Sequence, residues 1–319
     1  MHSDDDAVGT TLAGVQADPV PSPRLGAVII GRNEGERLRL CLESVAPRVD
    51  RMVYVDSGST DDSLDLARRM GAATVALDAD RPFTAARARN AGMMLLAATA
   101  PDIGLVQLID GDCELDPDWL DAACAAMERQ PGAAVVCGRR RERYPYATVY
   151  NGLCDREWNT PVGEAPSCGG DALVRSDAFF AVGGFAPALI AGEEPDLCHR
   201  LRMAGWRIYR IDAEMTRHDA AMTRFSQWWQ RNKRSGYAGA EAWHRRGHTD
   251  PATRRPVFSN LLWALALPLW PVLWVRVWRR SDAVYATHIV LGKLPHAQGQ
   301  FRFWLDVLMG RHSRLIEYK

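Results

Sequence analysis

Short apolar runs alternate with segments of helical spacing through the first half of the chain. The apolar runs lie at residues 26–30, 52–55, 73–77 and 105–109. Between the first two runs, residues 36–45 carry apolar side chains at the three- and four-residue steps of a helix. This alternation predicts an α/β fold with a mainly parallel sheet, flanking helices and right-handed crossovers.

Local signals set the expected ends of several elements. We expect Ser59 or Thr60 to cap a helix that runs to Met70, since acidic residues in its first turn suit the helix dipole. Further along, the pattern predicts a helix at 117–129, strands at 133–138 and 206–211, and helical segments at 224–236 and 291–319.

Length and composition indicate a folded protein. The chain has 319 residues, 47% of them hydrophobic, which is enough for one large domain or two ordinary ones with a real core. Residues 1–23 are rich in Gly, Pro, Ser and Asp and predict a flexible leader, and they lack the apolar stretch of a secretory signal peptide. Seven cysteines without CxxC spacing predict reduced, mostly buried thiols of a cytoplasmic protein.

The formal charge of the chain is zero, but it is unevenly distributed. Residues 1–223 have a net charge of −11 and residues 224–319 a net charge of +11. The second range is therefore treated as a separate basic, tryptophan-rich helical tail. We expect no nucleic-acid partner for the chain.

The tail contains an uncharged stretch at 257–275, which three arginines follow. Its length only just allows a spanning helix. Pro268, Pro271 and three tryptophans favour an in-plane or re-entrant membrane anchor instead, with the arginines at the headgroups. A buried helical hairpin is the remaining alternative.

The fourth apolar run ends in two carboxylates separated by one glycine, Asp110, Gly111 and Asp112. Ligands collect at the carboxyl ends of parallel strands, and two aspartates there can hold a hard divalent cation such as Mn²⁺ or Mg²⁺. Because Asp and Gly also favour turns, a simple solvated turn is the alternative.

Charged residues after the other strands add to this picture. Asp56 could accept hydrogen bonds from a base or ribose, while Arg87 and Arg89 could face phosphate. The alternatives are a helix-capping aspartate and a solvated helix face. A dinucleotide fold loses its main support, because the first strand is not followed by G-x-G-x-x-G, and a P-loop is absent.

Four segments in order resemble the family 2 glycosyltransferases of the membrane-associated bacterial type, which have a GT-A nucleotide-sugar fold. The segments are Ile-Gly-Arg-Asn-Glu at 30–34, Asp-Ser-Gly-Ser-Thr-Asp at 56–61, Ala-Arg-Asn-Ala-Gly at 88–92 and Asp-Gly-Asp at 110–112. The resemblance implies a site for a nucleotide-diphosphate sugar, with UDP as the expected nucleotide. By this resemblance, Asn33 and Glu34 lie in the nucleotide loop, Asp56 contacts the base, and Arg89 lies near the base and phosphates. In the DxD motif, Asp110 lies near the ribose, Gly111 is the spacer and Asp112 binds the metal.

An acidic cluster at 193–196 follows Gly183-Gly184-Phe185 and resembles the acceptor and catalytic-base segment of the same family. The register places Glu194 at the base position, with Glu193 as the other candidate. Simple capping at a helix N-terminus is the alternative. If the register holds, the carboxylate takes the proton of an acceptor hydroxyl during a single, inverting displacement.

Other acceptor-side residues are less specific. Gly170 and Asp196 belong to the segments that carry the resemblance, and Trp158 lies in an aromatic, loop-like stretch of 25 residues after Arg143. This stretch forms either an acceptor wall or a packed loop.

One histidine and one arginine further along are also candidates. His218 is expected as a third metal ligand, with its neighbour Asp219 as the alternative, although a lone histidine is more often an ordinary surface or core residue. Arg231 lies in a segment that loosely resembles Gln-x-x-Arg-Trp of processive members, and it either closes over the diphosphate or faces lipid or solvent.

Together these features predict a GT-A domain at 24–223 and a membrane-seeking tail at 224–319. The expected enzyme is an inverting, metal-dependent hexosyltransferase that acts on a saccharide or lipid-linked acceptor of the cell envelope at the cytoplasmic face of the membrane. A sugar nucleotidyltransferase is disfavoured, because residues 31–34 do not fit its glycine-rich loop. The paired acidic motifs argue against a catalytically silent membrane scaffold.

Overall fold

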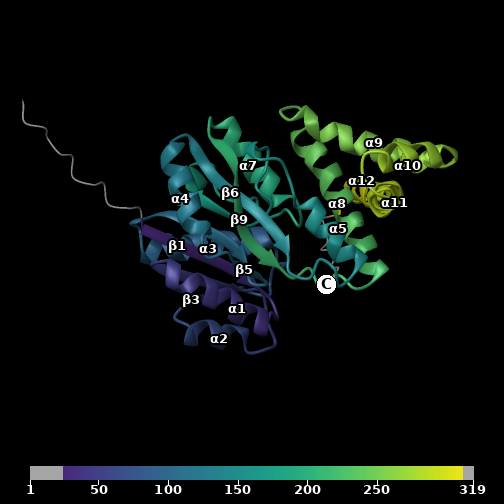
Figure 1. The fold of residues 1–319 in the computed structure, drawn as a ribbon. Coiled ribbons are helices and arrows are strands. Elements are labelled where there is room, and N and C mark those ends of the chain that lie inside the picture. Colours follow the sequence, from purple (N-terminus) through teal and green to yellow (C-terminus); the bar gives the residue numbers. More distant parts are fainter. Residues whose placement is uncertain (1–23, 312–319) are drawn as a thin grey trace, which may run out of the picture.

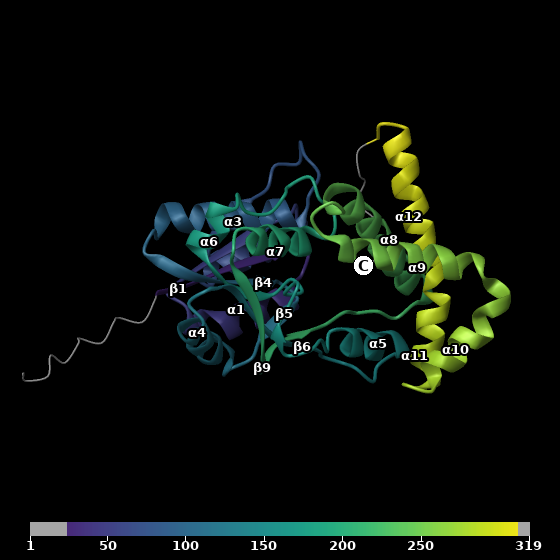
Figure 2. The same ribbon diagram turned by 90° about the horizontal axis from the view of Figure 1, so that it is seen from above.

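The computed structural model describes residues 24–311. The predicted leader at 1–23 and the last part of the predicted C-terminal helix lie outside the described residues. An α/β part that contains the sheet lies beside a helical part that the tail forms, and the two are in contact along one side (Figures 1 and 2).

The first half of the sheet is parallel, as the sequence predicts. The sheet order runs β3-β2-β1-β4 in this half, and all three pairings are parallel. The strands are β1 (Arg24–Gly31), β2 (Arg51–Asp56), β3 (Ala73–Ala76) and β4 (Ile103–Asp110). The central run of β1 is fully buried, as expected for a strand covered on both faces.

Helices connect these strands in the expected positions. They are α1 (Glu36–Val45), the short 3₁₀ helix η1 (Ala46–Arg48), α2 (Ser63–Arg69) and α3 (Ala85–Thr99). The buried side chains of α1 recur at helical spacing and face the sheet. Thr84 caps α3 by accepting a hydrogen bond from the backbone N–H of Arg87.

The second half of the sheet is mixed in direction. It continues with β8-β6-β9-β5, and β7 pairs with β9 off this path. The strands are β5 (Cys113–Leu115), β6 (Ala133–Glu142), β7 (Gly163–Glu164), β8 (Ala172–Arg175) and β9 (Arg207–His218). β8 is antiparallel to both β4 and β6, whereas β6 and β9 are parallel. The helices of this half are α4 (Trp119–Arg129), α5 (Val149–Glu157), α6 (Ser176–Ala181) and α7 (Glu193–Met203).

Three local predictions are wrong. The helix after β2 begins at Ser63, because Ser59 donates its hydroxyl to Asp56 and Thr60 donates its backbone N–H to Asn33. The aromatic stretch after Arg143 is not a loop throughout, since α5 forms within it. The strands β6 and β9 also extend beyond their predicted ends, and β9 continues to His218.

The tail folds into helices that stand beside the sheet part. They are α8 (Phe225–Arg246), η2 (Pro251–Thr253), α9 (Arg254–Leu265), η3 (Leu267–Leu269), α10 (Trp270–Trp278), α11 (Ala283–Leu291) and α12 (Lys293–Leu308). The helices α8 and α12 approach each other at two glycines. A Cβ atom on Gly299 would lie 1.9 Å from the carbonyl oxygen of Lys233, and one on Gly236 would lie 2.1 Å from that of His296.

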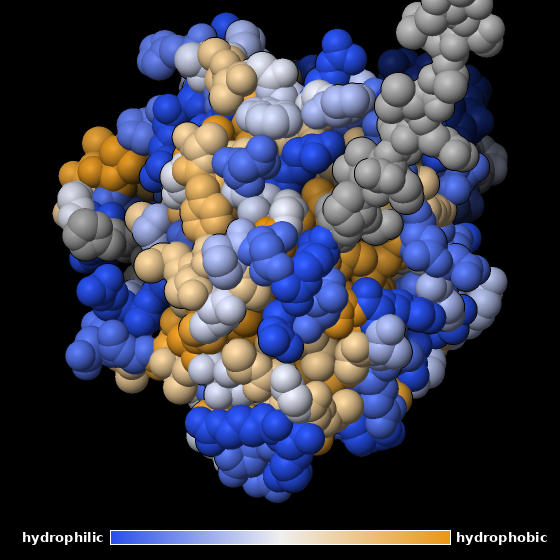
Figure 3. Space-filling model, turned by 90° about the vertical axis from the view of Figure 1, so that its left-hand side faces the viewer, coloured by the Kyte–Doolittle hydropathy of each residue, from blue (hydrophilic) through white to orange (hydrophobic). Residues whose placement is uncertain are grey.

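The predicted apolar stretch at 257–275 is bent. Within residues 24–311, no single helix has the length and hydropathy of a membrane span, but the segments Pro251–Leu265 and Leu267–Trp278 pass that test together and meet at 95°. This pair and its neighbours expose many large apolar side chains: Phe258, Leu262, Leu265, Leu267, Leu269, Val272, Trp278 and Val284. One face of the molecule, seen from the sheet side, instead mixes hydrophobic and hydrophilic patches (Figure 3).

Candidate functional site

The extended β9 brings His218 to the end of β4. The short strand β5 directly follows Asp112 and pairs antiparallel with β9, so that Cys113 lies opposite His218. Nε2 of His218 and Oδ2 of Asp112 are 3.2 Å apart, and both side chains are buried. Residues 106 positions apart in the sequence thereby form a carboxylate–imidazole pair.

A network of ion pairs surrounds Asp110. Arg89, which is 3% exposed, donates one hydrogen bond to Asp110 and one to Glu193, at 2.8 and 2.9 Å. Arg140 lies 2.6 Å from the buried Asp171 and 3.6 Å from Asp110. This network links the ends of β4 and β6 to the start of α7.

The charges of this group leave a net negative site. Four carboxylates, at Asp110, Asp112, Asp171 and Glu193, are offset by two guanidinium groups, so the formal charge is −2 with His218 neutral. Burial alone would raise the pKa of Asp110, but the two arginines hold that pKa below its ordinary value. A partly buried cluster of this charge matches a divalent cation, and its oxygen and imidazole donors suit Mn²⁺ or Mg²⁺.

Two glycines allow the close approaches at this site. A Cβ on Gly111 would lie 3.1 Å from the carbonyl oxygen of Ile30, to which the Gly111 N–H donates. Gly170 has a φ of +105°, and a Cβ there would lie 3.2 Å from Arg140. The spacer of the Asp-Gly-Asp motif is therefore held against β1, and Gly170 lies against a site arginine.

The loops after β1 and β2 are tied together by side chains. Asn33, at a φ of 55°, accepts a hydrogen bond from the N–H of Thr60 through its side-chain oxygen. Asp56 is 4% exposed, and its carboxylate accepts hydrogen bonds from the N–H groups of Gly58 and Ser59. Asp56 therefore organises the loop after β2, and Asn33 connects that loop to the loop after β1.

These elements enclose a cleft of about 800 Å³. Among the predicted residues, its lining includes Asn33, Glu34, Asp110, Asp112, Trp158, His218 and Arg231. The guanidinium of Arg140 lies over the Trp158 ring, 5.6 Å from its centroid, and the same ring meets that of His218 edge-on. Trp158 therefore forms a wall beside the Asp112–His218 pair.

The two glutamates at the start of α7 have different partners. Glu193 pairs with Arg89, as described above. Glu194 is 7% exposed, and its Oε1 accepts a 2.5 Å hydrogen bond from the N–H of Cys168 and lies 3.1 Å from the thiol of Cys198. Only Glu193 is part of the charged network.

Two predicted residues lie elsewhere. Arg87 donates hydrogen bonds to the carbonyl oxygens of Asp78 and Arg81, so its guanidinium binds the loop before α3. It lines a different cavity from the cleft. Asp196 pairs with Arg200 along α7 and with Arg246 of α8, which connects the two helices. The predictions that Arg87 binds the donor and Asp196 the acceptor are therefore not supported by their contacts.

Comparison with known sequences identifies the family. The model of glycosyl transferase family 2 matches residues 27–165. An uncharacterized glycosyltransferase of Mycobacterium tuberculosis and another of Mycobacterium bovis are each 31% identical over 195 residues, which cover 56% of this chain and 79% of the relative. The chain belongs to glycosyl transferase family 2.

Solved structures agree with this assignment at the level of the fold. A mannosyltransferase from Pyrobaculum calidifontis, in complex with GDP-Man and Mn²⁺, has a TM-score of 0.62 at 18% identity, covering 91% of this chain and 89% of its own. Glucosyl-3-phosphoglycerate synthase from Mycobacterium tuberculosis, in complex with Mn²⁺, UDP and glucosyl-3-phosphoglycerate, has a TM-score of 0.51 at 21% identity, covering 70% and 80%. This family 2 glycosyltransferase therefore has the GT-A fold.

Arg140, Asp171 and Arg234 also belong to the site or its cleft and were not predicted from the sequence. Asp171 is fully buried and accepts a hydrogen bond from Thr216 as well as pairing with Arg140. Arg234 of α8 lines the cleft and donates to the carbonyl oxygen of Ile190. A polar residue inside the Gly169-Gly170-Asp171-Ala172-Leu173 segment, just before an apolar run, was the available signal for Asp171.

Proposed function

We propose that this family 2 glycosyltransferase moves a sugar from a nucleotide-diphosphate sugar, with UDP as the expected nucleotide, to a hydroxyl or phosphate of a saccharide or lipid-linked acceptor. The observation that carries the proposal is the Asp112–His218 pair in the wall of the large cleft, beside a network of net negative charge. Two fold neighbours have been solved with Mn²⁺ and a nucleotide or nucleotide sugar, which supports the same ligands here.

The cleft has groups suited to each part of such a donor. Asn33 and Glu34 line the cleft near the loop that Asp56 organises, which supports assigning them to the nucleoside. Arg231 and Arg234 line the same cleft from α8 and are suited to the diphosphate. Asp112 and His218 would hold a divalent cation, which when bound neutralises charge on the departing diphosphate.

Glu194 is the better candidate for the general base. The carboxylate of Glu193 is already engaged, because Arg89 donates a hydrogen bond to it and forms an ion pair with it. Glu194 is held by a backbone N–H and a thiol, both neutral. In the proposed reaction, Glu194 takes the proton of the acceptor hydroxyl while the hydroxyl oxygen attacks the anomeric carbon. The bond from that carbon to the nucleoside diphosphate breaks in the same step, so the configuration inverts.

The tail is proposed to hold the enzyme on the cytoplasmic face of a membrane, where cell-envelope glycans are built. The bent pair of α9 and α10 exposes apolar side chains between basic ends. Arg254 and Arg255 at the start of α9, and Arg279 and Arg280 after α10, are exposed. This composition suits a helix pair that lies in the interface, with arginines at anionic headgroups.

Calorimetry on the full chain tests the donor site. UDP, GDP and CDP would be titrated with and without Mn²⁺ into the wild type, Asp112→Ala and Asp116→Ala, the last a matched control outside the lining of the cleft. We expect one nucleotide to bind in a metal-dependent way, with binding lost in Asp112→Ala and kept in Asp116→Ala. If none of the three binds under either condition, the transferase assignment of this cleft is wrong.

A further inference from the structure

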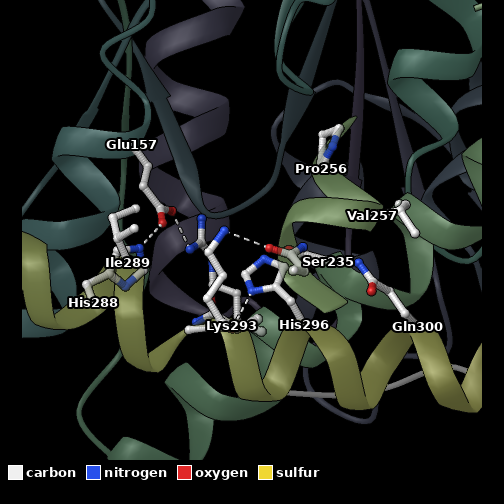
Figure 4. A pocket seen from close by; sticks show the side chains of 14 residues that line it. Glu157, Ser235, Pro256, Val257, His288, Ile289, Lys293, His296 and Gln300 are labelled. Atoms are coloured by element: carbon white, nitrogen blue, oxygen red, sulfur yellow. Dashed lines mark hydrogen bonds and ion pairs between the residues drawn. The ribbon is translucent and has the colours of Figure 1, made fainter. Parts of the chain in front are cut away.

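A second cavity, of about 360 Å³, lies within the helical tail and is shown in Figure 4. Helices α8, α9, α11 and α12 form its walls, and Glu157, the last residue of α5, reaches it from the sheet part. In Figure 4, Glu157 faces His288, and Lys293, His296 and Gln300 follow one another along α12. The donor site described above does not use this cavity.

Close helix packing fixes the shape of the cavity. Gly236 and Gly299 let α8 and α12 meet at backbone distance, and a side chain at either position would collide with the other helix. This contact holds Lys293 and His296 on α12 near Arg231 and Ser235 on α8, all of which line the cavity. The cavity is thus built from rigid elements rather than loops.

The lining carries more basic than acidic groups. Among the described residues that line it, Arg231, Lys293, His288 and His296 are basic and Glu157 is the only carboxylate. Glu157 already has two partners, since it pairs with Arg231 at 2.5 Å and with His288 at 2.8 Å. Despite the effect of burial, these two partners lower the pKa of Glu157 to about 2, so the glutamate remains ionised and is fully used by them.

Among the described residues, Lys293 contacts neutral oxygens instead of a carboxylate, and one polar atom of Gln300 has no hydrogen-bond partner. The ammonium of Lys293 contacts the side-chain oxygens of Ser259 and Asn260, which are neutral, and burial lowers its pKa. Gln300 is 1% exposed, and its side-chain oxygen has no hydrogen-bond partner among residues 24–311. Half a turn of that amide would present its NH₂ group to the cavity instead.

One residue connects this cavity to the donor cleft. Arg231 lines both, and Trp158, next to Glu157 in the chain, lines the donor cleft. Arg231 is therefore shared by the walls of the two cavities. The nucleotide loops around Asn33 contribute nothing to the lining of the tail cavity, which separates it from the donor end of the cleft.

We propose that the tail cavity binds a phosphate group of the acceptor, with Lys293 as its cationic partner and with His296 and Gln300 as neutral polar partners. The inference rests on the proposed function, because it gives that reaction a phosphate-bearing class of acceptor. Phosphate suits the cavity better than a carboxylate, since it has more acceptor oxygens to share between Lys293 and Gln300, which both lie on α12. The phosphate belongs either to a soluble ester or to a lipid headgroup.

The test measures thermal unfolding of the full chain with inorganic phosphate and with glycerol 3-phosphate, against chloride of equal ionic strength. Lys293→Met removes the cation, and His296→Gln is a second variant if the first fails to fold. Arg302→Gln is the matched control, because Arg302 lies on α12 but outside the cavity lining. We expect the Tm of the wild type and of Arg302→Gln to rise with phosphate concentration, and the rise to be lost in Lys293→Met.

Co-sedimentation with phosphatidic acid and phosphatidylcholine vesicles separates the two sources of phosphate. Lys293-dependent binding to phosphatidic acid vesicles, without an effect of glycerol 3-phosphate, assigns the phosphate to a lipid, and the reverse assigns it to a soluble ester. Equal Tm shifts in the wild type, Lys293→Met and Arg302→Gln, without Lys293-dependent vesicle binding, would overturn the proposal. Nucleotide titration measures binding at the donor site separately. The phosphate proposal can therefore fail while the donor-site proposal holds, or the reverse.

Discussion

Glu193 and Glu194 are adjacent in the sequence, yet their carboxylates have different partners. With the base assigned to Glu194, we expect Glu194→Gln to lower the rate of nucleoside diphosphate release by roughly 10²–10⁴-fold, because a glutamine cannot accept the proton. The rate can be measured on the donor sugar with water as the acceptor. The affinity for the metal–nucleotide complex should stay close to that of the wild type, since in the proposed reaction Glu194 contacts the acceptor and neither the metal nor the nucleotide.

Glu193→Gln is the matched variant and should have another effect. It leaves Arg89 paired with Asp110 alone, so we expect weaker nucleotide binding together with a smaller change in rate. A large loss of rate with unchanged nucleotide affinity in Glu193→Gln, and a small one in Glu194→Gln, would reverse the assignment of the base.

The residues of the site differ in how far the sequence could predict them. Asp110 and Asp112 follow an apolar run, and their place at a strand end follows from the local pattern. Arg140 lies in a run of charged residues that suggests a solvent-exposed edge, but its side chain is only 12% exposed and packs against Asp171 and Trp158. Its partners are distant in the sequence, so only the pairing of the strands reveals its role.

At the scale of elements, apolar runs predicted the four strands of the parallel half well and the ends of β6 and β9 poorly. The ends of β6 and β9 contain charged residues, such as Arg141 and Glu214, that pair with each other across the two strands. Their segments therefore lack the apolar signal of a buried strand, although the ladder continues through them. The extension of β9 to His218 forms the Asp112–His218 pair. Hydropathy does not mark the end of this strand, so the position of His218 beside Asp112 could not be predicted from the local pattern.

The contact of α8 with α12 makes a prediction about stability. Gly299→Ala would place a methyl group 1.9 Å from the carbonyl oxygen of Lys233, and because the obstacle is backbone, the helices must separate. We expect a loss of at least about 2 kcal/mol in the free energy of unfolding, measured by urea denaturation. Gly239→Ala on α8 is the control, since a Cβ there meets nothing within 4 Å and alanine favours a helix by up to about 1 kcal/mol. Equal effects of the two changes would mean that the helices do not meet at Gly299.

At the scale of the whole molecule, the acidic sheet part and the basic tail have separate roles in the proposed enzyme. The donor cleft joins them, since its lining includes residues of β1, β4 and β9 as well as Arg231 and Arg234 of α8. A membrane that holds the tail would therefore also hold one wall of the donor cleft. This arrangement would bring a lipid-borne acceptor to the site without a long search through solution.

The exposed apolar side chains of the bent helix pair make this membrane contact testable. Leu262 and Leu265 are 64% and 83% exposed, so Leu262→Glu together with Leu265→Glu should disturb packing little while it opposes insertion between lipids. We expect the double variant to lose most of its co-sedimentation with vesicles that contain anionic lipid, and the binding of the wild type to weaken with added salt because exposed arginines contribute. Met94→Glu, on the exposed face of α3 at 65% exposure, is the control and should bind as the wild type does. If all three proteins bind vesicles equally, or none binds, the exposed apolar side chains of the bent pair do not hold the enzyme on lipid, and the proposed membrane contact is wrong.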